Sequence, residues 1–217
     1  MNILVVGNPD SYAEFNLKFD LNHQVVFKSS SNLAEEDIKQ AQVVFDFVIT
    51  PKSTHGPLYS SNSDAVLFVN SVMTTLSVLL EKFNWPNSVI GFNGLPGMFN
   101  KPLLEITSLE ADPWVQQTCD QLGSDFRLVE DRIGMVTPRV VCMIINEAFY
   151  TVEEGTATEA DIDLAMKLGT NYPAGPFDMA STIGVQLVCQ LLEALLLETG
   201  NIRYSVCPLL KKRSLEV

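Results

Sequence analysis

Short apolar runs separated by polar stretches dominate the first half of the sequence, and they constrain its fold more than any other feature. A strand that is buried on both faces gives a continuous apolar run, and helices between such strands join them in parallel. The pattern therefore predicts an α/β domain with a mainly parallel sheet. The predicted strands are Ile3–Val6, His23–Lys28, Val43–Thr50, Ala65–Asn70, Ser88–Phe92 and Leu103–Ile106.

Three segments of this half have the composition of helices, namely Asn32–Gln42, Val72–Phe83 and Pro113–Leu122. Pro113 suits a first helical turn, and Asp112 just before it is of a residue type that caps helices.

The second half changes to helical patterns after about Asp131. Arg139–Glu154 is apolar nearly all round, which predicts a buried helix. Thr158 precedes a helix at Asp161–Leu168 as a capping residue, and the basic tail from Lys211 is expected to fray. Pro176–Thr182 and Gly184–Thr199 are further predicted helices. We therefore predict an α/β domain at 1–126 and an all-helical domain at 127–217, joined near Phe126–Arg132.

Charge and composition exclude several functions. The chain has 26 acidic and 14 basic residues and a net charge of −12, which disfavours nucleic acid as a partner. No apolar run is long enough for a membrane span, and the N-terminus lacks the features of a signal peptide, so the expected location is cytoplasmic. The four cysteines are widely spaced, which disfavours zinc and disulfides, and the acidic residues at 153–163 fit a solvated helix turn better than a metal site.

An ordered set of residues in the helical half, between Asn146 and Gly184, resembles the C-terminal domain of the 3-hydroxyacyl-CoA dehydrogenase family. CPLLKK, at 207–212, is similar to a late segment of that family. The α/β half resembles the family's NAD-binding domain more weakly, through NILVVG, HQVVF, DFVIT, SVMTTLS and GFNGLPGMFNKPLLEI. The matching residues of the helical half are Asn146-Glu147-Ala148, Glu154-Gly155, Asp161-Ile162-Asp163, Ala165-Met166, Gly169, Pro173, Gly175-Pro176-Phe177 and Ile183-Gly184.

The resemblance implies a shortened Rossmann-like domain followed by the helical domain. In the family the helical domain forms a homodimer and closes one side of an acyl-CoA site. The family reaction is hydride transfer between NAD and a 3-hydroxyacyl-CoA, in fatty acid metabolism. A helical arm of several dozen residues, which the family places between its second and third strands, is missing from this sequence.

The glycine-rich loop that would hold NAD is eroded. The family pattern G-x-G-x-x-G corresponds here to residues 7–12, GNPDSY, in which only Gly7 remains. Pro9 removes an N–H donor, and Asp10 adds a negative charge where a pyrophosphate would lie. The acid that would bind the ribose falls at Ser29. Gly7 and Ser29 are therefore the candidate cofactor-binding residues, and the alternative is an ordinary turn after a strand.

The residues that match the family's catalytic positions are also altered. Asn93 falls at the catalytic histidine, and an amide cannot accept a proton near neutral pH. Glu105 matches the glutamate that orients that histidine, and it is either a retained site residue or an ordinary strand residue. Thr74 falls at a serine near the substrate oxygen, and it is either a site hydroxyl or a helix cap. Pro138 replaces an asparagine of the helical domain.

His55 could replace the missing base, because it follows a predicted strand and so lies at the carboxyl end of the sheet. The alternative is a solvated loop histidine. The sequence leaves three hypotheses: a family member with impaired or lost dehydrogenase activity that dimerises or binds an acyl-CoA-type ligand, an active divergent oxidoreductase, and an interaction or scaffold protein without ligand chemistry.

Overall fold

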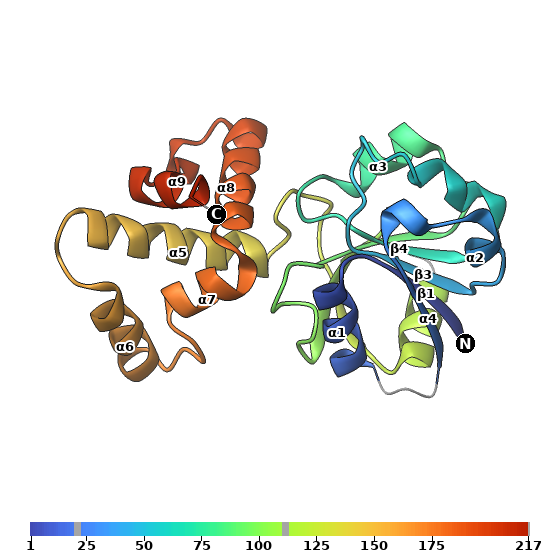
Figure 1. The fold of residues 1–217 in the computed structure, drawn as a ribbon, viewed down its shortest axis with the longest axis horizontal. Helices are drawn as coiled ribbons and strands as arrows, with labels where there is room; N and C mark the ends of the chain where they lie inside the picture. The colour runs from blue at the N-terminus through green and yellow to red at the C-terminus, as the bar shows by residue number, and fades with distance from the viewer. Residues whose placement is uncertain (20–22, 110–112, 217) are drawn as a thin grey trace. The chain divides into compact units, whose positions relative to one another are not determined.

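The computed structural model describes residues 1–19, 23–109 and 113–216, and the chain divides into two compact units, Met1–Met135 and Val136–Val217. The first unit is an α/β unit and the second is helical (Figure 1). Among the described residues no single helix has the length and apolar composition of a membrane span, although α7 (Pro176–Ile183) and α8 (Val185–Thr199), with a bend of 92° between them, meet that test as a pair.

The α/β unit contains one seven-stranded sheet with the order β2-β1-β3-β4-β5-β6-β7. Strands β1 to β5 are parallel to one another, β6 is antiparallel to β5, and β7 is parallel to β6. The predicted mainly parallel, Rossmann-like sheet is confirmed. The strands are β1 Asn2–Val6, β2 Gln24–Lys28, β3 Val43–Asp46, β4 Val66–Asn70, β5 Val89–Phe92, β6 Leu103–Thr107 and β7 Asp125–Leu128.

Helices cover both faces of this sheet (Figure 1). Alternate strand residues form two separate apolar clusters, because successive side chains of a strand point to opposite faces. One cluster includes Phe15 and Val115 of α1 and α4, and the other includes Ile38 and Leu79 of α2 and α3. The helical segments are α1 Pro9–Lys18, η1 Ser30–Asn32, α2 Glu35–Lys39, η2 Gly56–Ser61, α3 Leu76–Phe83 and α4 Pro113–Leu122.

Several predictions for this unit need correction. The sequence analysis missed α1, which Asn8 caps and Pro9 begins. The helix predicted at Asn32–Gln42 is shortened to α2, and the one predicted at Val72–Phe83 begins only at Leu76. The predicted junction Phe126–Arg132 overlaps β7, which pairs with β6 inside the sheet, and the division between units falls after Met135. Asp112, the expected cap of α4, lies outside the described residues.

The helical unit packs around the buried residues of α5 and α8. Asn146 of α5 fixes the chain after η3, since its Nδ2 donates to Ser205 O at 2.9 Å and its Oδ1 accepts from Cys207 N at 2.9 Å. α5 is not buried all round as predicted, because Val140 is half exposed. The elements are α5 Thr137–Glu153, α6 Glu159–Gly169, α7 Pro176–Ile183, α8 Val185–Thr199, η3 Ile202–Tyr204 and α9 Pro208–Ser214.

The basic tail does not fray, contrary to the prediction, because most of it belongs to α9. Arg213 pairs with Glu159 of α6 and lies 5.2 Å from the centre of the Phe149 ring. Lys211 pairs with Glu193 of α8. The predicted cap of α6 is confirmed, since Thr158 Oγ1 accepts from Asp161 N at 3.2 Å.

Candidate functional site

The carboxyl ends of the parallel strands are where open α/β sheets bind ligands, at the point where the strand order reverses. Here β1 is followed by β2 on one side and by β3 on the other, so the reversal lies between β1 and β3. The predicted site residues Gly7, Ser29, Thr74 and Asn93 all follow the ends of strands β1, β2, β4 and β5.

The turn between β1 and α1 is closed by its own side chains. Asn8 Oδ1 accepts hydrogen bonds from Ser11 N at 2.8 Å and from Ser11 Oγ at 2.9 Å. Pro9 has no N–H to offer, and Asp10 places a negative charge in the first turn of α1. The helix terminus that could attract an anion is therefore already capped.

Gly7 lies in a tightly packed position. A Cβ atom added there would lie 3.0 Å from Ser11 Cβ and 3.4 Å from Phe47 Cβ. Phe47 follows β3, and its main-chain N donates to Val6 O at 2.9 Å. The ring of Phe47 lies 5.0 Å from that of Phe92 and 4.8 Å from that of Phe99, so the residue packed beside Gly7 belongs to an aromatic cluster.

The segment after β5 is bound to α1, which holds Phe99 in place. Glu14 accepts from Gly97 N, and Lys18 Nζ donates to Lys101 O at 2.6 Å. Burial lowers the pKa of Lys18. These two contacts close the loop after β5 over α1 and the aromatic cluster.

Ser29 lies directly after β2. Its Oγ is 3.1 Å from Ser31 Oγ, so the hydroxyl is used within its own turn. The neighbouring Lys28 pairs with Asp37 at 3.0 Å, and that lysine helps to hold the pKa of the Asp37 carboxyl low.

Asn93 is buried, and both ends of its amide contact its own loop. Oδ1 accepts from Leu95 N at 3.3 Å, and Nδ2 lies 3.8 Å from Met98 Sδ. Its main-chain N donates to Glu105 O at 3.0 Å, so the pairing of β5 with β6 brings Asn93 and Glu105 together. Asn93 thus organises the loop at the position where the resemblance places a base.

Thr74 does not cap α3. The cap is Thr75, whose Oγ1 accepts from Val78 N at 3.3 Å, so the capping alternative for Thr74 is wrong by one residue. Among the described residues no hydrogen bond joins Gly7, Ser29 or Thr74 to Asn93. Of the predicted site residues, Asn93 and Glu105 are joined by a main-chain hydrogen bond.

The start of α3 is occupied by a carboxylate that the sequence analysis missed. Asp131 Oδ1 accepts from Leu76 N at 2.7 Å, and its Oδ2 accepts from Ser77 N at 2.9 Å and from Ser77 Oγ at 2.6 Å. A carboxylate is favourable at a helix N-terminus. The N-termini of α1 and α3 are thus both capped from within the chain.

His55 is not a solvated loop residue, because only 6% of its surface is exposed. Its Nε2 lies 2.8 Å from Asp46 Oδ2, and Tyr59 OH donates to the same oxygen at 2.6 Å. Asp46 Oδ1 accepts from Val48 N at 2.9 Å. Burial, together with the Asp46 carboxylate, raises the pKa of Tyr59 well above its usual value. The signal in the sequence was an acid at the end of a buried strand, which needs a partner.

The cysteines and the potential metal ligands of the described residues do not form a reactive site. All four cysteines are free and buried, and burial raises the pKa of Cys119 to about 11 and of Cys142 to about 12. Such thiols are not nucleophiles at neutral pH. Within residues 1–19, 23–109 and 113–216 no group of three or more potential metal ligands is arranged to hold an ion.

Comparison with known proteins shows which family the helical unit matches. The model of the domain described as "3-hydroxyacyl-CoA dehydrogenase, C-terminal domain" matches residues 134–216. The "Probable 3-hydroxybutyryl-CoA dehydrogenase" of Bacillus subtilis is 28% identical over 198 residues, which are 87% of this chain and 69% of that protein. Residues 134–216 thus match the C-terminal domain of the 3-hydroxyacyl-CoA dehydrogenase family, and the chain as a whole is similar to dehydrogenases of that family.

Solved structures of this dehydrogenase family share the fold of the chain. The crystal structure of (S)-3-hydroxybutyryl-CoA dehydrogenase from Ralstonia eutropha matches with a TM-score of 0.76 at 21% identity, over 99% of this chain and 93% of that one. The "3-hydroxyadipyl-CoA dehydrogenase" of Escherichia coli is 44% identical over 95 residues, which are 44% of this chain and 20% of that protein. The chain thus matches only a fifth of this longer dehydrogenase.

Proposed function

We propose that this member of the 3-hydroxyacyl-CoA dehydrogenase family has lost hydride transfer and acts as a homodimeric binding protein for an acyl-CoA-type ligand. The observation that carries the proposal is the state of Asn93. An amide cannot take up the hydroxyl proton of a 3-hydroxyacyl group near neutral pH. Both ends of this amide also contact the loop 93–98, so Asn93 serves the fold of that loop.

The residues at the β1–α1 turn do not fit NAD, the cofactor that the family implies. A dinucleotide needs free N–H groups at the helix N-terminus and small residues beneath its pyrophosphate. Asn8 caps that terminus, Pro9 lacks an N–H, and Asp10 would repel the phosphates. The Ser29 hydroxyl cannot accept from both ribose hydroxyls as a carboxylate does. We therefore assign no step of a reaction to this cofactor.

The alternative of a divergent oxidoreductase with His55 as the base is less well supported. A general base must reach the substrate proton. His55 is buried and bound to Asp46, so its role in this arrangement is to satisfy that carboxylate. The remaining alternative is a scaffold without ligand chemistry. A measurement of acyl-CoA binding distinguishes it from our proposal.

Turnover and ligand binding test the proposal together. With acetoacetyl-CoA and NADH we expect kcat/KM to be lower than that of the Bacillus subtilis relative, assayed in parallel, by about 100-fold to 10,000-fold. A general base usually contributes a rate acceleration of about this size. Calorimetric titration should show binding of acetoacetyl-CoA and none of NADH. NADH oxidation at the relative's rate would contradict the loss of activity, and absence of acetoacetyl-CoA binding would favour the scaffold.

The homodimer is proposed through the helical unit. Apolar residues of α8 such as Val188 and Leu192 are buried within the chain and belong to its own core. Other apolar side chains of this unit are exposed, including Leu197 of α8 at 87% exposure, and a partner would cover them.

Sedimentation velocity tests the dimer directly. We expect the unmodified chain to be a dimer and Leu197→Asp to raise the dissociation constant by about 100-fold, because it places a charge in an apolar interface. Leu17→Asp is the matched control, since Leu17 is 74% exposed but lies on α1 of the other unit. A monomeric unmodified chain would overturn the proposal.

The four free, buried cysteines fit the reducing conditions of the cytoplasm, which we propose as the location.

A further inference from the structure

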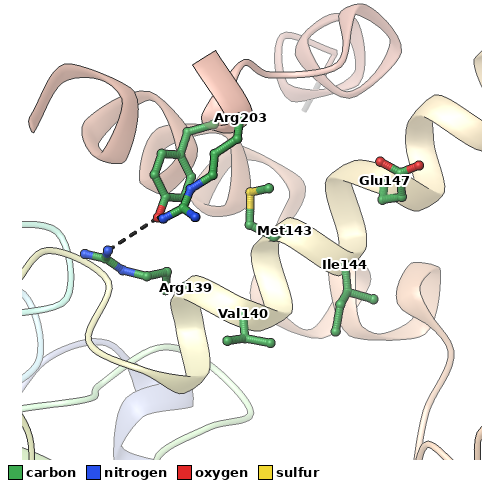
Figure 2. Close-up of a pocket in the computed structure, with 7 residues that line it drawn as sticks. Arg139, Val140, Met143, Ile144, Glu147 and Arg203 are labelled. Carbon is green, nitrogen blue, oxygen red and sulfur yellow. Dashed lines mark hydrogen bonds between the residues drawn. The ribbon is translucent and has the colours of Figure 1, made fainter. Parts of the chain in front are cut away.

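A groove on the helical unit is lined by one face of α5. It has a volume of about 390 Å³ and lies between α5 and η3 (Figure 2). The lining residues of α5 recur every three or four positions, as residues on one helix face do, and they are Val140, Met143, Ile144 and Glu147. The first three form an apolar strip, in which Val140 is 53% exposed although it is a large apolar residue. Such a strip on a surface helix is typical of a contact with another protein.

The two ends of the strip carry opposite charges. Figure 2 shows the guanidinium groups of Arg139 and Arg203 at one end and Glu147 at the other. Arg203 Nη2 donates to Tyr204 OH at 2.7 Å, and its guanidinium carbon lies 4.7 Å from the centre of the Tyr204 ring. Tyr204 is buried, so these contacts fix the position of the Arg203 charge.

Arg203 and Glu147 are the charges that a partner can reach. Both residues are exposed, and in the part of the chain that the structure describes neither of them forms an ion pair. Arg139, at the same end as Arg203, faces Glu198 of α8 and is not needed for the pairing. From position 139 to position 147 the helix advances by about 12 Å at 1.5 Å per residue, so the apolar strip separates the two charges.

A surface with a positive end, an apolar middle and a negative end is complementary to a second copy of itself. In a two-fold symmetric dimer the same surface is used by both chains, and each pair of contacting residues occurs twice. If the two-fold axis passes through the strip near Met143 and Ile144, the two α5 helices run antiparallel. Arg203 of each chain then faces Glu147 of the other, and the apolar strips cover one another.

Further apolar side chains adjoin the positive end of the groove. Leu197, next to Glu198 in the sequence, is 87% exposed, and Ile202, next to Arg203, is 82% exposed. They extend the apolar surface from α5 to the last turn of α8 and to η3. Burial of apolar surface supplies the affinity of such an interface, whereas charge pairs mainly select the partner and its orientation.

We propose that this groove is the homodimer interface, with a second copy of the chain as its occupant and the two α5 helices antiparallel across a two-fold axis. The inference rests on the homodimer proposed above and names its surface. A second copy matches both charged ends and the apolar strip at once, which is why we favour it over other occupants.

Charge reversal tests this arrangement in sedimentation velocity of the full-length chain. Arg203→Glu gives the groove two acidic ends, and Glu147→Arg gives it two basic ends. Each variant should raise the dissociation constant of the dimer by about tenfold or more, because like charges then meet twice in the interface. The two substitutions combined in one chain should restore the unmodified affinity to within about threefold, since the opposite charges face one another again.

Mixing the two single variants is the decisive measurement. In a mixed dimer each acidic end meets a basic end, so Arg203→Glu and Glu147→Arg should bind one another about tenfold more tightly than either binds itself. A loss of folding in either variant would not produce this preference. Arg127→Glu is the matched control, because it makes the same charge change at an exposed residue of β7, and it should leave the dissociation constant unchanged.

The possible failures separate this interface from the homodimer itself. A dimer that Leu197→Asp weakens, but that neither charge reversal weakens, would place the interface on another face of the helical unit and overturn the inference alone. Absence of any preference for the mixed dimer would also overturn the inference alone. A monomeric unmodified chain would overturn both the homodimer and this interface, and the groove would then have another occupant.

Discussion

Replacing Asp46 with alanine is expected to lower the free energy of unfolding of the α/β unit by about 3–5 kcal/mol. The carboxylate is fully buried and accepts from Tyr59 OH, from Val48 N and, at 2.8 Å, contacts His55 Nε2. Its removal leaves three buried polar groups without their partner, and each such group costs about 1–3 kcal/mol. His55→Ala should also destabilise the unit, because it leaves a buried carboxylate with fewer donors.

Tryptophan fluorescence during denaturation in guanidinium chloride measures this effect selectively, because Trp85 and Trp114 are the two tryptophans of the chain and both lie in the α/β unit. Asp64→Ala is the control, since Asp64 is exposed, and it should change the free energy of unfolding by less than about 0.5 kcal/mol. An Asp46→Ala midpoint equal to that of Asp64→Ala would show that the buried network does not stabilise the unit.

The α/β architecture could be predicted because six of its strands are apolar over nearly their whole length. β7 was not predicted, because Asp125–Leu128 lies at the sheet edge and is mostly exposed. α1 escaped because its interior is polar apart from a few residues such as Phe15, and its start depends on the local cap at Asn8. Hydrophobic periodicity predicts elements that bury a large apolar face, and β7 and α1 each bury only a small one.

The candidate site was predictable only in part. The predictions placed Asn93 just after one strand and Glu105 within the next, and the pairing of β5 with β6 brings their main chains together. The contacts of His55 and Asp131 were not predictable. Asp131, for example, binds the start of α3 from 54 or 55 positions away in the sequence. Such contacts depend on tertiary packing, which a single sequence shows only through an acid that needs a partner.

Gly175→Ala is expected to lower the free energy of unfolding of the helical unit by about 2–4 kcal/mol. Asp163 of α6 is buried and caps α7, with Oδ1 accepting from Phe177 N at 2.9 Å and Oδ2 from Asp178 N at 3.2 Å. An added Cβ at Gly175 would lie 2.1 Å from Asp163 Cγ and 2.4 Å from its Cβ. The short aspartate side chain cannot move away without leaving the start of α7, so the substitution destroys the cap.

A double-mutant cycle with Asp163→Gly tests this cause. Asp163→Gly alone should lower the free energy of unfolding by about 3–5 kcal/mol, through loss of the cap and the low helix propensity of glycine. Adding Gly175→Ala to it should change little, because the three atoms nearest to the new Cβ all belong to the lost side chain. Far-UV circular dichroism follows the helical unit, while tryptophan fluorescence should report an unchanged α/β unit.

Gly169→Ala is the control, since a Cβ there meets no atom within 4 Å, and it should be nearly neutral. Additive effects of Gly175→Ala and Asp163→Gly would show that the glycine is needed for a reason other than the approach of Asp163.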